Sequence, residues 1–297
     1  MRVFVTGATG FIGSAIVQEL VHAGHAVLGL TRSAVGAKSL VAAGAEVHLG
    51  DLEDRESLRL GASTCDGVIH TAFIHDFTNW TTCCEIDRSA IQALGSGLAG
   101  SKGPLVAASG TVVARIAHHP ATEDDPQSIS AGIPRSASEE AVRSIVACGV
   151  HASVVRLPPT VHGEGDNGFI QEMINIARQR TVSAYVGDGL NRWPAVHRLD
   201  AAHLFRLALE KGTAGATYNG VADEGVPIRE IAAVIGRRLR LPVVSKPADE
   251  AAEHFGFLGR VLSLDMPASS MVTQKSLGWQ PKQPGLISDL DHVRYFA

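Results

Sequence analysis

The chain has 297 residues, of which 45% are hydrophobic and 19% charged, so it can bury a large core and wholesale disorder is excluded. Its formal net charge is −4 and it has no Lys/Arg-rich stretch, which argues against nucleic acid as a main partner. No apolar run approaches the roughly 18 residues of a membrane span, and the short apolar segment at residues 3–5 does not make a secretory signal. The four cysteines form no CxxC pair and the histidines show no HxxxH or HExxH spacing, which predicts reduced thiols in the cytoplasm and no structural metal.

The first 30 residues predict a strand, a glycine turn, a helix and a second strand. Residues 2–6 form a short apolar strand, and residues 14–23 carry apolar side chains at helical spacing before Gly24 ends the helix. Residues 25–30 form the second apolar strand. This order is a βαβ unit, which implies parallel strands joined by a right-handed crossover.

The alternation of helices and strands continues along the first half of the chain. Helices are predicted at 34–43, 55–60, 81–98 and 136–148, and strands at 46–49, 67–70, 105–108 and 152–156. Repeated βα units predict an α/β fold with a doubly wound parallel sheet of the Rossmann type, covered by helices on both faces.

The second half of the chain predicts a smaller region beside this sheet. We assign residues 1–157 to a dinucleotide-binding domain, to which 196–220 return through a helix at 200–210 and a strand at 217–219. Prolines and glycines break the pattern after residue 157. Residues 158–195 and 221–297, with a helix at 228–240, are therefore predicted to form a substrate-binding cap.

Three glycines mark a candidate nucleotide site at the first strand–helix junction. Gly7, Gly10 and Gly13 follow the opening strand and begin the first helix. Free amides at a helix N-terminus bind phosphate, and glycines let the backbone approach a pyrophosphate closely. The context favours a dinucleotide site over a merely structural turn.

This turn reads TGATGFIG and resembles the TGxxGxxG signature of the extended short-chain dehydrogenases/reductases, the epimerase/dehydratase group. Five later segments resemble the same family in order: 50–52 (GDL), 68–72 (VIHTA), 109–113 (SGTVV), 156–163 (RLPPTVHG) and 196–200 (VHRLD), the last resembling VHVDD. The resemblance covers about residues 1–210. It implies cofactor contacts at Gly7, Thr9, Gly10, Phe11, Ile12, Gly13, Thr31, Arg32, Ser33, Asp51, Leu52, Thr71, Ala72, Phe73 and Pro158.

The end of the second strand bears on the choice of dinucleotide. NAD sites usually place a carboxylate there for the ribose 2′-OH, but this chain has Thr31 followed by Arg32. An arginine can pair with a 2′-phosphate through a bidentate fork, whereas the alternative is a solvated surface side chain. We therefore predict NADP rather than NAD.

The family's Tyr-x-x-x-Lys pair, in which the Tyr is the acid/base and the Lys lowers its pKa, is absent. None of Tyr185, Tyr218 and Tyr295 is followed four residues later by Lys. Arg135 and Ser136 lie where the pair is expected. Arg135 can polarise an oxygen or bind a carboxylate but cannot shuttle a proton. Alternatively, this segment is only a helix start, with Ser136 and Glu139 in a capping box.

Other side chains are candidates for the chemistry. Ser109 stands at the family's Ser/Thr position, where it could donate a hydrogen bond to a substrate carbonyl or merely cap a strand. Histidines are candidate acids because an imidazole titrates near neutral pH. The predicted catalytic residues are Ser109, Arg135, His162 and His197, and the predicted substrate contacts are His75, Thr111, Arg192 and Trp193, with Trp193 as a flat wall and Arg192 as an anion clamp.

We expect an NADP-dependent oxidoreductase that moves a hydride to or from a small carbonyl or alcohol substrate. Two alternatives stay open: an isomerase like the nucleotide-sugar epimerases, and a catalytically silent NADP-binding sensor, which would explain the missing pair. The resemblance also implies a homodimer through the helices at 81–98 and 136–148, although the apolar stripe Ile86, Ala90 and Leu94 suits any core-facing helix.

Overall fold

The computed structural model describes residues 1–114, 119–125 and 133–296 and contains a seven-stranded parallel sheet of order β10-β6-β5-β4-β1-β2-β3. The strands are β1 (Arg2–Thr6), β2 (Ala26–Thr31), β3 (Glu46–Leu49), β4 (Gly67–His70), β5 (Leu105–Gly110), β6 (Ala152–Leu157) and β10 (Thr217–Asn219). The predicted doubly wound Rossmann fold is confirmed. All seven strands end at one edge, which is where such folds bind their ligands.

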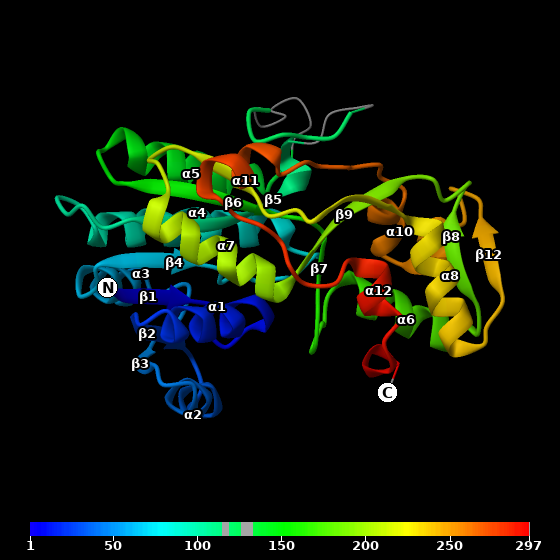
Figure 1. Cartoon of the computed structure of the whole chain (residues 1–297), viewed down its shortest axis with the longest axis horizontal. Coiled ribbons are helices and arrows are strands. Elements are labelled where there is room, and N and C mark those ends of the chain that lie inside the picture. Colours follow the sequence, from blue (N-terminus) through cyan, green and yellow to red (C-terminus); the bar gives the residue numbers. More distant parts are fainter. Residues whose placement is uncertain (115–118, 126–132, 297) are drawn as a thin grey trace.

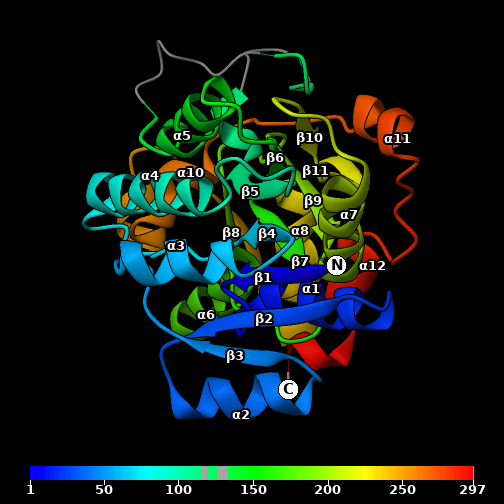
Figure 2. The same ribbon diagram turned by 90° about the vertical axis from the view of Figure 1, so that its left-hand side faces the viewer.

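Helices cover both faces of this sheet, because neighbouring strand residues point to opposite sides. Val5 packs in a core with α1 (Phe11–His22), α2 (Ala34–Ala42) and α7 (Arg198–Lys211), whereas Phe4 packs in a second core with α3 (Arg55–Ser63), α4 (Trp80–Gly97) and α5 (Ser136–Ala147). Figure 2 shows α3, α4 and α5 on one side of the sheet and α7 on the other.

A second body lies beyond the carboxyl edge of the sheet (Figure 1). Its strands are β7 (Thr160–His162), β9 (Arg192–His197) and β11 (Asp223–Pro227) in one sheet, and β8 (Ser183–Val186) and β12 (Val243–Lys246) in another. Its helices are α6 (Phe169–Arg180), α8 (Ile228–Leu239), α9 (Ala251–Phe255), α10 (Leu258–Leu262) and α12 (Leu286–Leu290). A third core built around Trp193, Ile231 and Leu258 holds these elements together.

The C-terminal tail is shared between the two bodies, although the sequence assigned 221–297 wholly to the cap. Leu277, at the end of α11 (Met271–Leu277), and Trp279 pack in the core of α1 and α7. The Trp279 indole N–H donates to the Asp200 carbonyl at 3.0 Å. The tail therefore fastens the main sheet as well as the second body.

The apolar stripe on α4 is used inside the chain. Ala90 and Leu94 are fully buried against α3 and α5. The outer surface of the two helices is polar, with Arg88 donating to Glu140 at 2.6 Å. The homodimer stays a prediction. Within the described ranges, no helix is long and apolar enough to cross a membrane.

Candidate active site

The glycine turn packs tightly against the neighbouring loop. Gly7 has φ +69°, and a Cβ at Gly7 would lie 2.7 Å from the Ala72 amide nitrogen. A Cβ at Gly13 would lie only 2.0 Å from the Gly7 carbonyl oxygen. The first turn of α1 has no acidic residue, and its N-cap, Gly10, provides no side chain to bond the free amides. These amides therefore form a cradle for an anion.

The end of β2 presents a positive charge beside this cradle. Thr31 is buried, and Ser33 caps α2 by accepting from the Gly36 amide at 3.0 Å. The Arg32 side chain is 79% exposed, and its Nη1 lies 3.7 Å from an oxygen of Asp51. So loose and exposed a pair contributes little to stability, which leaves the Arg32 guanidinium able to pair with a ligand.

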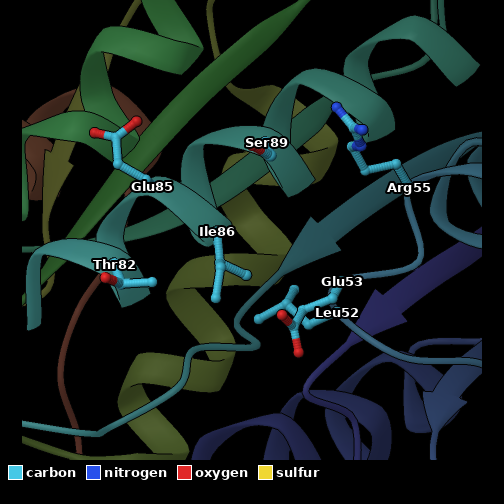
Figure 3. Close-up of a pocket in the computed structure, with 7 residues that line it drawn as sticks. All are labelled: Leu52, Glu53, Arg55, Thr82, Glu85, Ile86 and Ser89. Atoms are coloured by element: carbon cyan, nitrogen blue, oxygen red, sulfur yellow. The ribbon is translucent and has the colours of Figure 1, made fainter. Parts of the chain in front are cut away.

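A pocket of about 260 Å³ adjoins Asp51, between the β3–α3 loop and α4 (Figure 3). Leu52 and Ile86 form its apolar walls, and Glu85 and Thr82 lie at its α4 side. Its full lining is Leu52, Glu53, Arg55, Thr82, Glu85, Ile86 and Ser89. Of the predicted cofactor residues, Leu52 is the one that lines this pocket.

Two hydroxyl groups stand without partners where β5 ends. The Oγ of Ser109 and the Oγ1 of Thr111 are buried, and neither finds a hydrogen-bond partner among the described residues. The residues themselves are 5% and 2% exposed. A buried polar group without a partner costs free energy, so such groups at a sheet edge mark a place where a ligand could bond.

Arg135 is anchored beside these hydroxyls by a buried carboxylate. Its Nη1 donates to Asp87 Oδ2 at 2.7 Å, and its Nη2 donates to the carbonyl of Ala108 at 3.0 Å. Its guanidinium carbon lies 4.1 Å from the centroid of the Phe73 ring. These contacts hold the guanidinium group of Arg135 in place near Ser109, which follows Ala108 in the chain.

Asp87 is the centre of this network. Its carboxylate also accepts from Ser138 Oγ at 2.5 Å and lies 3.0 Å from His70 Nε2, while His70 Nδ1 lies 2.7 Å from Thr6 Oγ1. Burial alone would raise the pKa of Asp87, but Arg135 and His70 together lower it to about 2. Asp87 is therefore a fixed negative charge that links the end of β1 to Arg135.

Glu139, four residues after Arg135, forms a different pair from the one expected. The capping box with Ser136 is wrong, because the carboxylate of Glu139 accepts from Arg156 Nε at 2.8 Å and Nη2 at 2.9 Å. Both side chains are almost fully buried. The spacing that holds Tyr and Lys in the resembled family is therefore used here by an arginine and a glutamate, each with its own buried partner.

Aromatic rings continue the site from Arg135 toward the second body. Phe73 contacts His75 and Trp80 edge-on, with ring centroids 5.1 Å apart in both cases. Phe77 stacks on Trp80 at 5.0 Å and on Phe257 of the second body at 4.7 Å. His75 is exposed, and partial desolvation together with the nearby Arg135 charge lowers its pKa.

His162 and His197 lie in a separate buried cluster. His162 is fully buried, and its Nδ1 lies 2.8 Å from Asp289 Oδ2. Tyr295 accepts from the Gly163 amide at 2.8 Å, and His197 Nδ1 accepts from the Leu199 amide at 3.2 Å. The His162 ring is enclosed where α12 and the tail pack, and its Nε2 has no hydrogen-bond partner among the described residues, so its catalytic role stays a prediction.

Arg192 and Trp193 do not form the substrate-facing edge that the sequence predicted. Trp193 is fully buried in the core of the second body, so it is no exposed wall. Arg192 donates through Nε and Nη2 to Asp265, at 3.1 and 2.9 Å, which makes it a poor anion clamp. Pro158 is buried just after β6.

His197 leads to a prediction about acid stability. Burial and the neighbouring His162 lower the pKa of His197 from 6.5 to about 4. An unfolded chain binds a proton at this residue below about pH 6.5 while the folded chain does not, so stability is lost as the pH falls from 6.5 toward 4. His197→Asn, which keeps a capping side chain, should reduce the acid-induced loss by on the order of 1–2 kcal/mol, or roughly 2–6 °C in Tm. Thermal unfolding at pH 7.5 and 5.0 checks this, and an unchanged difference between the two pH values would contradict it.

Asp87 is the main site residue that sequence reasoning missed. It occupies a position on the apolar face of α4, one turn after Cys83 and one turn before Ile91, both of which are buried. A carboxylate on such a face needs a cationic or hydrogen-bonding partner. That signal was present in the sequence, but it did not reveal that the partners are Arg135, His70 and Ser138.

Comparison with known proteins agrees with this architecture. A model of the NAD dependent epimerase/dehydratase family matches residues 3–220. The uncharacterized protein C2A9.02 of Schizosaccharomyces pombe is 51% identical over 298 residues, covering 100% of both chains. A 4-hydroxy-2-methyl-3-oxo-4-farnesyl-3,4-dihydroquinoline-1-oxide ketoreductase of Stigmatella aurantiaca is 27% identical and covers 86% of this chain and 80% of its own.

A solved structure shows the same fold. The dTDP-glucose 4,6-dehydratase DesIV of Streptomyces venezuelae, solved with NAD and TYD bound, superposes with a TM-score of 0.81 at 20% identity, covering 100% of this chain and 97% of its own. With its parallel sheet, its glycine cradle and a family match over more than two thirds of its length, the chain belongs to the NAD dependent epimerase/dehydratase family.

Proposed function

We propose that this protein is an NADP-dependent oxidoreductase that interconverts a small carbonyl compound and its alcohol. The observation that carries the proposal is the pair of buried hydroxyls of Ser109 and Thr111, which have no partner among the described residues. Arg135 donates to the carbonyl of Ala108, the residue before Ser109, which brings a positive charge to this end of β5. Hydroxyl donors in such a place suit the oxygen of a substrate carbonyl. The ketoreductase description of the Stigmatella relative supports the same reaction class.

The residues present fit a dinucleotide. A Cβ would fill the cradle at Gly7 and Gly13, so the backbone there is shaped for close approach. The walls formed by Leu52 and Ile86 suit the flat faces of an adenine, and Arg32 lies 3.7 Å from Asp51, the residue before Leu52. When bound, the nicotinamide supplies hydride chemistry at a carbon.

The choice of NADP rests on Arg32, and it gives a direct prediction. Arg32→Ala should weaken binding of NADP by roughly 10- to 100-fold, because a charge-assisted bidentate contact to the 2′-phosphate is lost. Binding of NAD should change by less than about threefold. Calorimetric titration of both nucleotides checks this, and an equal loss for both would refute the preference.

The chain's own residues then share the proton chemistry. Ser109 and Thr111 donate hydrogen bonds to the carbonyl oxygen, and the Arg135 charge, held by Asp87, favours negative charge developing there. Arg135 cannot release its proton, so the proton added to the oxygen comes from solvent, either directly or through His75. Its lowered pKa favours the neutral form of His75, which can accept a proton from solvent and pass it on.

The surroundings favour an apolar substrate over a nucleotide sugar. The side chains that extend the site are rings, notably Phe73, Phe77 and Trp80, and they make its surroundings apolar. The predicted anion clamp Arg192 is already paired with Asp265.

Ser109 gives the second prediction for this function. Ser109→Ala should lower turnover by roughly 10- to 100-fold, with Thr111 supplying the residual hydrogen bond. The Kd for NADP should stay the same, because the hydroxyl acts on the substrate. Ser153→Ala, at a buried serine on β6, is the matched control and should leave turnover intact. Unchanged turnover in the Ser109 variant would remove this residue from the mechanism.

A substrate screen separates the enzyme from a silent sensor. Loss of NADPH absorbance is followed with aldehydes, ketones and quinones, including aromatic members of each class. We expect turnover with apolar carbonyl compounds. Tight NADPH binding without turnover across the panel would favour the sensor, and activity only with nucleotide sugars would favour the epimerase-like alternative.

A further inference from the structure

Arg198 covers the first turn of the nucleotide-binding helix. It is the first residue of α7, with His197 as the N-cap, and α7 packs alongside α1. Its Nη2 donates to Ser14 Oγ at 3.3 Å, and its guanidinium carbon lies 4.9 Å from the centroid of the Phe11 ring. Phe11 and Ser14 belong to the turn whose amides form the anion cradle.

The position of this charge is electrostatically unfavourable without an anion. Each helix N-terminus carries about half a positive charge, and Arg198 lies at the N-termini of both α7 and α1. In the part of the chain that the structure describes, Arg198 makes no ion pair. Its Nη1 donates to the main-chain carbonyl of Glu164 at 2.6 Å, while the exposed carboxylate of Glu164 only partly offsets the charge.

The side chain is also only partly satisfied. Its Nε is buried and has no hydrogen-bond partner among the described residues. Burial lowers the pKa of Arg198, so contacts within the chain do not fully compensate for the desolvation of its charge. A Cβ at Gly163, where φ is +138°, would lie 2.9 Å from Arg198 Cγ. The loop after β7 therefore leaves room for this side chain.

We propose that Arg198 binds the diphosphate of the cofactor together with the amides at the start of α1. The inference rests on the proposed dinucleotide cofactor and adds a contact to it. Arg198 stands where the resembled VHVDD segment has a valine, so the contact is a feature of this chain rather than of that motif. A diphosphate would neutralise the guanidinium and both helix N-termini together.

Two ligands without a nicotinamide test the contact. Adenosine 2′-phosphate has the 2′-phosphate alone, whereas 2′-phospho-ADP-ribose also has the diphosphate. Calorimetry should show that Arg198→Gln binds 2′-phospho-ADP-ribose roughly 10- to 100-fold more weakly and binds adenosine 2′-phosphate with unchanged affinity. Arg32→Gln should bind both ligands more weakly. Arg206→Gln, on the same helix but paired with Glu19, should bind both with unchanged affinity.

Stability without ligand provides an independent readout. If Arg198 serves a ligand, Arg198→Gln removes an uncompensated charge, so the free protein should keep or raise its Tm and gain less Tm from 2′-phospho-ADP-ribose. Arg198→Lys, which keeps the charge, should bind with intermediate affinity. Unchanged affinity for both ligands, equal losses for both, or a lower Tm with unchanged affinity would overturn the inference. If the unaltered protein binds neither ligand, the proposed cofactor itself is wrong.

Discussion

Replacing Asp87 with alanine is expected to destabilise the protein by about 3–5 kcal/mol, which corresponds to a Tm lower by roughly 10 °C. Asp87 is fully buried and compensates the charge of Arg135 at 2.7 Å while it also bonds Ser138 and His70. Removing Asp87 leaves the mostly buried charge of Arg135 without its compensating carboxylate. The cost therefore far exceeds that of a surface ion pair.

The surface ion pair between Arg88 and Glu140 provides a matched control for the buried pair. Arg88 donates to Glu140 across α4 and α5, as Asp87 bonds Arg135, but this pair lies at the surface, where Glu140 is 44% exposed. Glu140→Ala should cost no more than about 1 kcal/mol. Urea unfolding of the two variants and the unaltered protein measures both effects. A loss in Asp87→Ala no larger than in Glu140→Ala would show that the buried network carries little stability.

The same network should matter for the chemistry through Arg135. Asp87→Asn keeps the shape and one acceptor oxygen but removes the charge, so the variant should fold while Arg135 is held less firmly over Phe73. Asp87 is thus a positioning residue, since it contacts the guanidinium and not the proposed substrate. The contact with Arg135 accounts for a carboxylate on an otherwise apolar helix face.

The sequence predicted the main sheet well because its signals are local. Apolar runs bounded by turns placed strands at 2–6, 46–49, 67–70 and 217–219, and the structure has β1, β3, β4 and β10 at those residues. The glycine spacing predicted the tight turn before α1, because a turn of this kind requires residues without side chains. Element ends differ by one to a few residues, as where β5 runs on to Gly110.

For the second body, the sequence predicted the residue ranges but not most of the helices and strands. Helix α6 was missed although Ile170, Met173, Ile174 and Ala177 follow helical spacing, because the glycines just before it indicate a loop. Strand β7 has only three residues, and it pairs with β9 across more than 30 residues of chain. Such pairing leaves little local pattern to read.

The sequence did not predict how the candidate site residues are connected. Arg135 donates to the carbonyl of Ala108, the residue before Ser109, so the two predicted residues lie near the end of β5. The buried pairs could not be inferred, because each joins separate elements: His162 meets Asp289, which is 127 residues away in the chain. Trp193 was misassigned for a related reason, since a large aromatic side chain fits a core as well as a binding surface.

Replacing Gly13 with alanine is expected to abolish nucleotide binding, with a Kd raised at least 100-fold for NADP and NAD alike. The new Cβ would lie 2.0 Å from the carbonyl oxygen and 2.7 Å from the carbonyl carbon of Gly7, and both of these are backbone atoms. No side-chain rotation can relieve such an overlap, so the first turn of α1 must move away from the glycine turn. The amides would then no longer converge on one anion.

Gly24→Ala, at the other end of α1, separates this effect from general destabilisation. No atom lies within 4 Å of a Cβ there, but its φ of +82° strains any residue with a side chain, at a cost of roughly 1 kcal/mol. We expect this variant to lose a few degrees in Tm and to bind NADP normally. Calorimetry with NADP and thermal unfolding are run on both variants. Normal binding by a folded Gly13→Ala protein would show that the cofactor does not lie against this turn, and the proposed oxidoreductase would lose its physical basis.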